Sequence, residues 1–333
     1  MKMAQDKVRF GIIGVGRWAG KLAGAVERSR EAEVVTGFSR TEETRKAFEK
    51  EVGCRSADSL DALLADDEVE GVLVVTPHST HADIIVQAAS AGKHVFVEKP
   101  LSLTVESGRR AVEAAEKASV VLQVGHNRRR LGATRRLREM IDAGELGMVH
   151  QLEANITNAN GQVPRQGWRN DPGECPIGGL TALGVHKIDN FHYLAGPIKR
   201  VFAFSKKLFA GGELDDVSIV GMEFEGGPLG YLQTSIVVPV IISTSVYGTK
   251  ASAWSDEDGT KLYVQKKDEA ARSELPVEGG DALADEFAEF ARCIRGGGRP
   301  EVGGAEGVEV VAVLEAIIES VNTGRAVEVS NFR

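Results

Sequence analysis

Apolar runs alternate with amphipathic segments along the first 124 residues of the chain. Short, mostly β-branched apolar runs occur at residues 8–13, 33–38, 71–75, 95–100 and 120–124. Segments with helical periodicity separate them, at residues 21–28, 41–51, 59–64, 82–91 and 105–118. Strands that are covered by helices on both faces are apolar throughout, so this alternation predicts a parallel, doubly wound α/β sheet of the Rossmann type.

The pattern changes near residue 151. Strand-like stretches follow one another at residues 149–157, 201–209, 217–224, 230–238, 241–247 and 261–264. Helical segments do not separate them, which predicts a largely antiparallel open sheet in a separate α+β domain. One helical segment, at 178–194, interrupts the series and carries apolar residues at helical spacing. We therefore predict a dinucleotide-binding domain at 1–124 and a substrate-binding and oligomerisation domain at 125–333.

Charge and cysteine content narrow the class of protein. The 333 residues carry a formal net charge of −8, which argues against a nucleic acid or an anionic membrane as partner. Three scattered cysteines without a C-x-x-C pair indicate neither a disulfide framework nor a cysteine zinc site, and no cluster of His and carboxylates suggests a metal. The first seven residues lack a signal-peptide core, and no apolar run approaches the length of a membrane span. These features predict a cytoplasmic enzyme without a metal.

A glycine motif follows the first predicted strand. Gly14 and Gly16 form G-x-G-x-x-A with Ala19, and Arg17 and Trp18 fill the motif. Gly14 permits a tight turn, Gly16 lets the backbone approach a pyrophosphate, and Ala19 permits close packing of the helix. The phosphate would rest on the helix N-terminus. This motif, between a strand and a helix, predicts a dinucleotide site.

The end of the second strand indicates the type of dinucleotide. An NAD-binding unit has Asp or Glu there to bind the ribose 2′-hydroxyl, whereas this chain has Ser39 and Arg40. A guanidinium can bind a 2′-phosphate and lie against the adenine ring. We therefore predict NADP as the preferred cofactor, with NAD possible. Alternatively, Arg40 only begins the charged helix at 41–51.

Three further strand ends carry polar residues that meet the same edge of the predicted sheet. Thr76 and Pro77 end one strand, and Glu98 and Lys99 end the next, before Pro100. Ligands bind at the carboxyl edge of such sheets. An isolated Glu-Lys pair would more often be a solvated strand end, so the prediction of chemistry at Lys99 depends on its neighbours. The remaining candidates are His81, a structural or supporting group on the first turn of a helix, and Asn127, where the chain crosses the same edge.

The helical segment of the second domain offers a proton-transfer group. His186 and Asp189 are three residues apart and therefore lie on one side of a helix. A carboxylate beside a histidine can orient the ring and stabilise its imidazolium, although such a pair could equally lie on the surface. Trp168 and Arg169 lie in the loop that leads into this segment.

Taken together, these motifs resemble the glucose-fructose oxidoreductase, inositol dehydrogenase and MocA (Gfo/Idh/MocA) family along essentially the whole chain. The specific part is Glu98-Lys99-Pro100 together with Gly184-x-His186-x-x-Asp189. The resemblance implies a Rossmann domain, a sheet domain whose open face mediates a homodimer or homotetramer, and hydride transfer between a nicotinamide and a sugar, cyclitol or related polyol. Lys99 would polarise the substrate oxygen and His186 would exchange the proton, with Asp189 as the third catalytic residue. The cofactor would contact Gly14, Gly16, Arg17, Trp18, Ser39, Arg40, Thr76, Pro77, His81, Glu98, Lys99, Asn127, Trp168 and Arg169.

One position departs from the family pattern. Polyol dehydrogenases of the family usually carry an Asp four residues before the catalytic histidine, and this chain has Ala182 there. We interpret the change as divergence in substrate. Alternatives are a dihydrodiol dehydrogenase of the same family, a hydrolase or lyase that uses its nicotinamide transiently, and a catalytically silent NADP-binding sensor. The substrate, the reaction direction and the oligomeric state do not follow from the sequence.

Overall fold

The computed structural model of the protein describes residues 7–163, 167–209 and 211–333. Residues 1–6, on which the expectation of no signal peptide mostly rests, lie outside this range. The described chain forms two compact units. One contains the residues up to Asn127 together with Asp281–Val308, and the other contains Arg128–Gly280 together with Glu309–Arg333.

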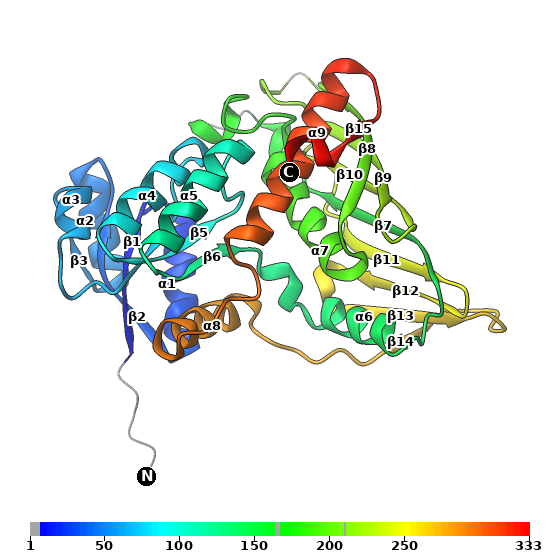
Figure 1. The fold of residues 1–333 in the computed structure, drawn as a ribbon, viewed down its shortest axis with the longest axis horizontal. Helices are drawn as coiled ribbons and strands as arrows, with labels where there is room; N and C mark the ends of the chain where they lie inside the picture. The colour runs from blue at the N-terminus through cyan, green and yellow to red at the C-terminus, as the bar shows by residue number, and fades with distance from the viewer. Residues whose placement is uncertain (1–6, 164–166, 210) are drawn as a thin grey trace, which may run out of the picture. The chain divides into compact units, whose positions relative to one another are not determined.

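A parallel six-stranded sheet forms the centre of the first unit, in the order β3-β2-β1-β4-β5-β6 (Figure 1). Its strands are β1 (Val8–Ile13), β2 (Ala32–Phe38), β3 (Arg55–Ser56), β4 (Gly71–Val74), β5 (His94–Glu98) and β6 (Leu122–Gly125). Helices α1 (Arg17–Ser29), α2 (Glu42–Val52), α3 (Leu60–Leu64), α4 (His81–Ser90) and α5 (Val105–Lys117) connect them. Strands β2 and β4 flank β1. Right-handed crossovers that leave β1 in opposite directions place their helices on opposite faces, which confirms the predicted doubly wound sheet.

Helix α8 (Ala282–Gly296) also belongs to this first unit, although the sequence assigned it to the second domain. Phe290 stacks on Phe10 of β1 with 5.2 Å between ring centroids, and Phe287 lies 4.8 Å from Phe96 of β5. All four side chains are fully buried. The apolar residues of α8 repeat at helical spacing, but this spacing does not show which sheet the buried face covers.

A nine-stranded sheet forms the second unit, in the order β14-β13-β12-β11-β7-β10-β9-β8-β15. Its strands are β7 (Val149–Thr157), β8 (Ile198–Lys206), β9 (Val217–Phe224), β10 (Leu229–Ser235), β11 (Ile242–Gly248), β12 (Ala251–Asp256), β13 (Lys261–Lys266), β14 (Ser273–Leu275) and β15 (Val327–Glu328). Neighbouring strands are antiparallel except for β7 and β10, which run parallel. The predicted, largely antiparallel sheet is therefore confirmed.

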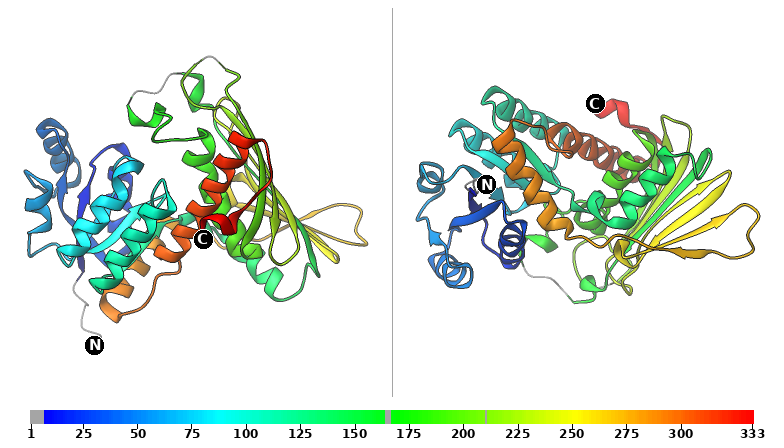
Figure 2. Two further views of the ribbon diagram at one scale, coloured as in Figure 1. Left: turned by 45° about the horizontal axis from the view of Figure 1, so that its top comes forward. Right: turned by 90° about the horizontal axis from the view of Figure 1, so that it is seen from below.

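Helices cover one face of this sheet. Helix α6 (Gly132–Asp142), helix α7 (Val185–Ala195) and the part of α9 (Gly304–Thr323) that belongs to this unit lie against the same face, as both views in Figure 2 show. Along β8, Val201 and Ala203 are buried on that side, whereas Phe202 and Phe204 are exposed on the other. The opposite face is therefore the open one. In the part of the chain that the structure describes, no helix is long and apolar enough to cross a membrane.

Candidate functional site

The glycine turn has the geometry that a dinucleotide site needs. Gly14 has a φ of +94°, and an added Cβ there would lie 2.7 Å from the carbonyl oxygen of Val75, so only glycine fits. An added Cβ at Gly16 would meet no atom within 4 Å, which leaves open space beside the turn. Helix α1 starts after Gly16 without a side-chain cap or an acidic residue in its first turn. Its first N–H groups therefore remain available for an anion, and these residues fit a bound pyrophosphate.

Two arginines lie near the end of β2: Arg40 in the turn that follows it and Arg45 in α2. Arg40, the residue predicted to bind a 2′-phosphate, is exposed directly after Ser39. Arg45 was not predicted as a site residue: its Nη1 donates to the carbonyl oxygen of Ser39 at 2.9 Å, and its Nη2 lies 3.7 Å from Asp58. Its side chain is only 11% exposed. A second guanidinium is therefore bound to the Ser39 carbonyl. Its positive charge lies close to the place where a 2′-phosphate would bind.

Contacts within the first unit fix the residue on each side of Lys99. The indole Nε1 of Trp18, in the first turn of α1, donates to Oε1 of Glu98 at 2.7 Å. Glu98 ends β5, and Pro100 after Lys99 has its carbonyl oxygen 2.8 Å from Nδ1 of His81. Lys99 itself is half-buried, and the Lys99–Pro100 peptide bond is cis. The structure thus places Lys99 at the carboxyl end of β5, in the same unit as the glycine turn.

The other predicted residues of this edge take their expected places. Thr76 and Pro77 follow β4, and Asn127 follows β6 in a single helical turn, Asn127–Arg130. The hydroxyl of Thr80 donates to Oγ1 of Thr76 at 2.7 Å and holds its side chain. His81 is buried, and both of its ring nitrogens face backbone carbonyl oxygens. The predicted residues of the first unit therefore lie on the strand ends and helix starts of one sheet edge.

In the second unit, His186 follows a short π-helix. This π-helix spans Leu180–Gly184 and includes Ala182, and His186 lies in the first turn of α7, 9% exposed. Gly178 just before it has a φ of +54°, and an added Cβ there would lie 1.9 Å from the carbonyl oxygen of Asp215. Single-turn π-helices occur frequently at functional sites. Glycine at 178 therefore lets the segment that leads to His186 pack closely against the backbone at Asp215.

Asp189 does not form the pair with His186 that the sequence suggested. Its two carboxylate oxygens accept from Nε and Nη2 of Arg129 at 2.8 and 2.7 Å. Asp189 is fully buried and Arg129 is 7% exposed. A run of three arginines such as 128–130 is usually a solvated helix start. Arg129 instead forms a buried bidentate ion pair, and no local signal identifies a partner 60 residues away.

Lys187 is a buried amine that the sequence analysis did not single out. Its Nζ donates to the hydroxyl of Thr244 on β11 at 2.8 Å. Burial, with a smaller contribution from the Arg128 guanidinium, lowers the pKa of Lys187 to about 7. Burial also lowers the pKa of Arg128 to about 10, so Arg128 stays charged and pairs with Asp258. Lys187 is therefore largely neutral just above neutral pH.

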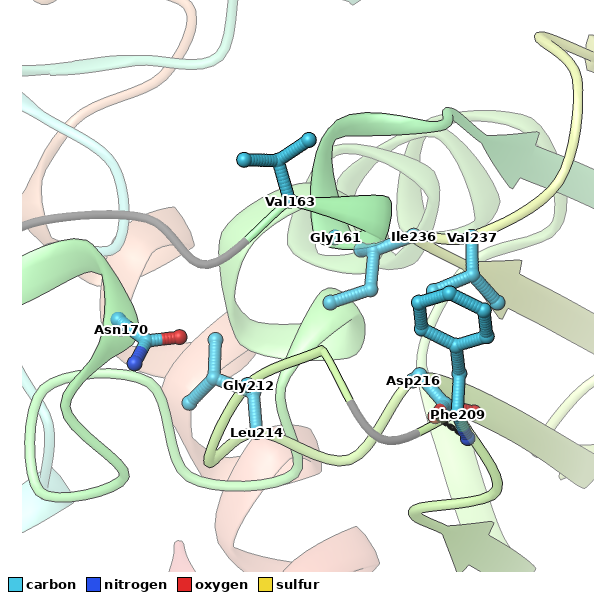
Figure 3. Close-up of a pocket in the computed structure, with 9 residues that line it drawn as sticks. All are labelled: Gly161, Val163, Asn170, Phe209, Gly212, Leu214, Asp216, Ile236 and Val237. Atoms are coloured by element: carbon cyan, nitrogen blue, oxygen red, sulfur yellow. Dashed lines mark hydrogen bonds between the residues drawn. The ribbon is translucent and has the colours of Figure 1, made fainter.

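The loop with Trp168 and Arg169 lies at another part of the second unit. The Arg169 guanidinium stacks 4.1 Å from the centroid of the Trp168 ring, and that ring packs against Cys175, Leu214 and Ile236. A crevice of about 10 Å³ opens beside this cluster, where Phe209 lies close to Val237 (Figure 3). That volume holds about one water molecule, so the crevice is too small for a substrate. Among the residues the structure describes, no group of His, Cys, Asp or Glu could hold a metal.

Comparisons with known proteins agree with this architecture. Residues 8–126 match a model of an oxidoreductase family with an NAD-binding Rossmann fold, and residues 134–254 match the GFO/IDH/MocA C-terminal domain. The chain is 29% identical to a 1,5-anhydro-D-fructose reductase of Ensifer adhaerens over 96% of this chain and 98% of that protein. It is 26% identical to a myo-inositol 2-dehydrogenase of Thermotoga maritima over 96% and 98%.

A solved structure from Desulfitobacterium hafniense, of a protein proposed to be an NADPH-dependent oxidoreductase, is 35% identical. It superposes with a TM-score of 0.94 and covers 98% of this chain and 99% of its own. Both domain models together match well over half of the chain, and this likeness extends along nearly all of it. The chain therefore belongs to the GFO/IDH/MocA family of NAD-binding oxidoreductases.

Proposed function

We propose that the protein is an NADP-preferring dehydrogenase or reductase that acts on a hydroxyl or carbonyl carbon of a sugar, cyclitol or related polyol. The observation that carries this proposal is the position of Lys99. It follows Glu98, whose carboxylate is bound to Trp18 in the first turn of the cofactor helix. An amine fixed beside a dinucleotide turn suits a group that holds a substrate oxygen. The names of the relatives, a reductase of an anhydro sugar and a dehydrogenase of a cyclitol, support the substrate class.

The cofactor role is divided among three parts of the first unit. The N–H groups at Arg17 and Trp18, after the turn of Gly14 and Gly16, bind the pyrophosphate, because the start of α1 has neither a cap nor an acid. Ser39 and Arg40 bind the 2′-phosphate, and Arg45 beneath them adds positive charge. The nicotinamide end is bound by residues at the other strand ends of this unit: Thr76, Pro77, Glu98, Lys99 and Asn127. When bound, the nicotinamide supplies the hydride acceptor or donor.

Lys99 and His186 carry the proton chemistry in this proposal. The Lys99 amine donates to the substrate oxygen; the positive charge of an oxidised nicotinamide, when bound beside it, would disfavour the ammonium form and so suit proton exchange near neutral pH. His186 takes or returns the proton through its imidazole. Asp189 acts as a positioning residue, since its two oxygens hold Arg129 and thereby fix the helix that carries His186. Ala182 lies one helical turn before His186, where polyol dehydrogenases of the family usually carry an Asp. The smaller side chain leaves room there for a different substrate group.

We further propose that the open sheet face forms a homodimer or homotetramer interface. Phe204 is 60% exposed and Ile219, its cross-strand neighbour, is 50% exposed. The Phe202 and Phe204 rings touch edge to face with 5.0 Å between their centroids. A second copy that brings the same patch by a two-fold axis would cover these rings. The three cysteines all lie within the described residues and form no disulfide, which supports a cytoplasmic location.

A substrate survey tests the proposed activity. The protein is incubated with polyols, cyclic diols, aldoses and keto-sugars, each with NADP and with NAD in both directions, and the absorbance of the reduced nicotinamide is followed. We expect turnover with at least one sugar or cyclitol and a higher kcat/KM with NADP than with NAD. Turnover limited to aromatic-derived diols would favour a dihydrodiol dehydrogenase. Cofactor binding without turnover on any compound would contradict the proposal.

A further inference from the structure

His81 connects the ends of two neighbouring strands through its ring. It is the first residue of α4 and is 1% exposed. Its Nδ1 lies 2.8 Å from the carbonyl oxygen of Pro100, after β5, and its Nε2 lies 3.0 Å from the carbonyl oxygen of Thr76, after β4. Both distances are those of ordinary hydrogen bonds. One buried ring therefore links the two backbone segments that border Lys99 and Thr76.

Both partners of the His81 ring can only accept hydrogen bonds. A neutral imidazole has one N–H and one nitrogen lone pair, so it can donate to only one carbonyl. Its other nitrogen would then direct a lone pair at a carbonyl oxygen about 3 Å away, which is repulsive. The doubly protonated ring donates to both oxygens. Hydrogen bonding to the charged form favours that form, in opposition to burial.

The carbonyl contacts of His81 complement the contact that Trp18 makes. On one side of Lys99, the Trp18 indole holds the Glu98 carboxylate at 2.7 Å. On the other side, His81 holds the carbonyl of Pro100. Backbone torsions at Lys99 are thereby restrained from both neighbours. Loss of the His81 bond would release one of these restraints and leave the Trp18 bond intact.

We propose that His81 is a positioning residue for Lys99 and that it acts as a buried imidazolium, which ties the Pro100 carbonyl to the Thr76 carbonyl. The role for Lys99 rests on the proposed function, whereas the charge state of His81 rests on the two carbonyl contacts alone. His81 touches neither cofactor nor substrate in this arrangement, because its two nitrogens are directed at the backbone. It supports catalysis by keeping the Lys99 amine in one orientation.

The ionisable groups near His81 come from the elements around it. The ring of His78, in the preceding helical turn, packs edge-on with 5.7 Å between centroids. Glu98 and Lys99 precede its partner Pro100 on the β5 side. On the helix side, Asp83 of α4 forms an exposed ion pair with Arg110 of α5. The Glu98 carboxylate favours a positive charge on His81, whereas an ammonium on Lys99, next to Pro100 in the chain, opposes it.

Nitrogen NMR of the intact protein with labelled histidine tests the charge state without any substrate. His81 is assigned by the signals missing from His81→Gln and, independently, by contacts with Thr76 and Pro100 in the wild type. We expect both ring nitrogens of His81 to stay protonated at about pH 8, and the exposed His150 serves as the reference signal. A single protonated nitrogen on His81 at that pH would overturn the proposal, and this result does not depend on whether the variant folds.

Kinetics of the same variants test the positioning role. His81→Gln keeps one donor and loses the charge, and we expect kcat to fall about tenfold to a hundredfold while KM for NADPH changes by less than about twofold. His150→Gln is the matched control and should leave both unchanged. An unchanged kcat in folded His81→Gln would overturn the positioning role. If the wild type has no redox turnover but His81 holds two protons, the proposed function fails and the charge state remains supported.

Discussion

Replacement of Lys187 by methionine should remove a pH dependence from the stability of the second unit. Burial lowers the pKa of Lys187 from 10.5 to about 7. Between these values the unfolded chain carries a proton on Lys187 that the folded chain lacks, so the free energy of unfolding rises with pH in this window. The stability that Lys187 gains by losing its proton is lost again as the pH falls from about 10.5 to about 7. Below that range the contribution of Lys187 changes no further. The slope for one proton is about 1.4 kcal/mol per pH unit.

The size of the effect follows from the same two pKa values. At pH 7, where folded Lys187 is about half protonated, a fall from 10.5 to about 7 corresponds to a destabilisation of about 4 kcal/mol. Methionine has a similar length and no charge, and it loses the hydrogen bond to Thr244, worth about 1 kcal/mol. Lys187→Met should therefore be more stable than the wild type by about 3 kcal/mol at pH 7. This difference should shrink to below about 1 kcal/mol near pH 9.5.

Urea unfolding at a series of pH values between about 7 and 9.5 measures this difference. Tryptophan fluorescence reports on the second unit through Trp168 and Trp254, and Trp18→Phe in every variant removes the signal of the first unit. Lys206→Met, which removes an exposed lysine of β8, is the matched control and should keep the wild-type slope. If Lys187→Met and the wild type show parallel pH dependences, Lys187 is charged in the folded protein and the reasoning from its burial is wrong.

Three other predictions follow from single contacts. Asp189→Asn leaves Arg129 buried without its carboxylate and should lower the free energy of unfolding by about 3–5 kcal/mol in urea titrations; a loss below about 1 kcal/mol would contradict the buried ion pair. Arg40→Ala should raise KM for NADPH about tenfold or more and leave KM for NADH nearly unchanged, with Lys46→Ala on α2 as a control; equal effects on both cofactors would contradict 2′-phosphate binding. Phe204→Glu should shift the mass by light scattering toward the monomer, and an unchanged mass would exclude this face as the interface.

Local patterns in the sequence were sufficient for the parallel sheet and the glycine turn of the first unit, although not for helix α8. Gly14 and Gly16 are recognisable because their spacing reflects one turn between one strand and one helix, and the structure gives Gly14 the positive φ that the turn requires. Residues at the ends of parallel strands meet at one edge by topology alone, which placed Thr76 and Lys99 correctly. Such features depend on neighbours in the chain, so they can be read without knowledge of the tertiary structure.

Long-range pairings could not be predicted in this way. Arg129 and Asp189 are 60 residues apart, and an arginine triplet gives no sign that its middle residue is buried. The burial of Lys187 could not be predicted either, because its amine is removed from water only where α7 packs against the sheet and reaches Thr244 on β11. The contacts of Trp18 with Glu98 and of His81 with two carbonyls likewise depend on how helices close onto strand ends. The sequence placed Trp18, Glu98 and His81 at the carboxyl edge of the parallel sheet, but the partners of these side chains could be found only from the fold.

The central claim is that the Lys99 amine serves the redox reaction, and Lys99→Met measures it most directly. Initial rates of reduced-nicotinamide change are compared for the wild type, Lys99→Met and Lys50→Met, an exposed lysine of α2, on the best substrate of the survey, and dinucleotide binding is measured by fluorescence. We expect kcat/KM to fall about 10²- to 10⁴-fold in Lys99→Met with dinucleotide affinity within about twofold, and no change in Lys50→Met. Wild-type turnover by a folded, cofactor-binding Lys99→Met would contradict the account.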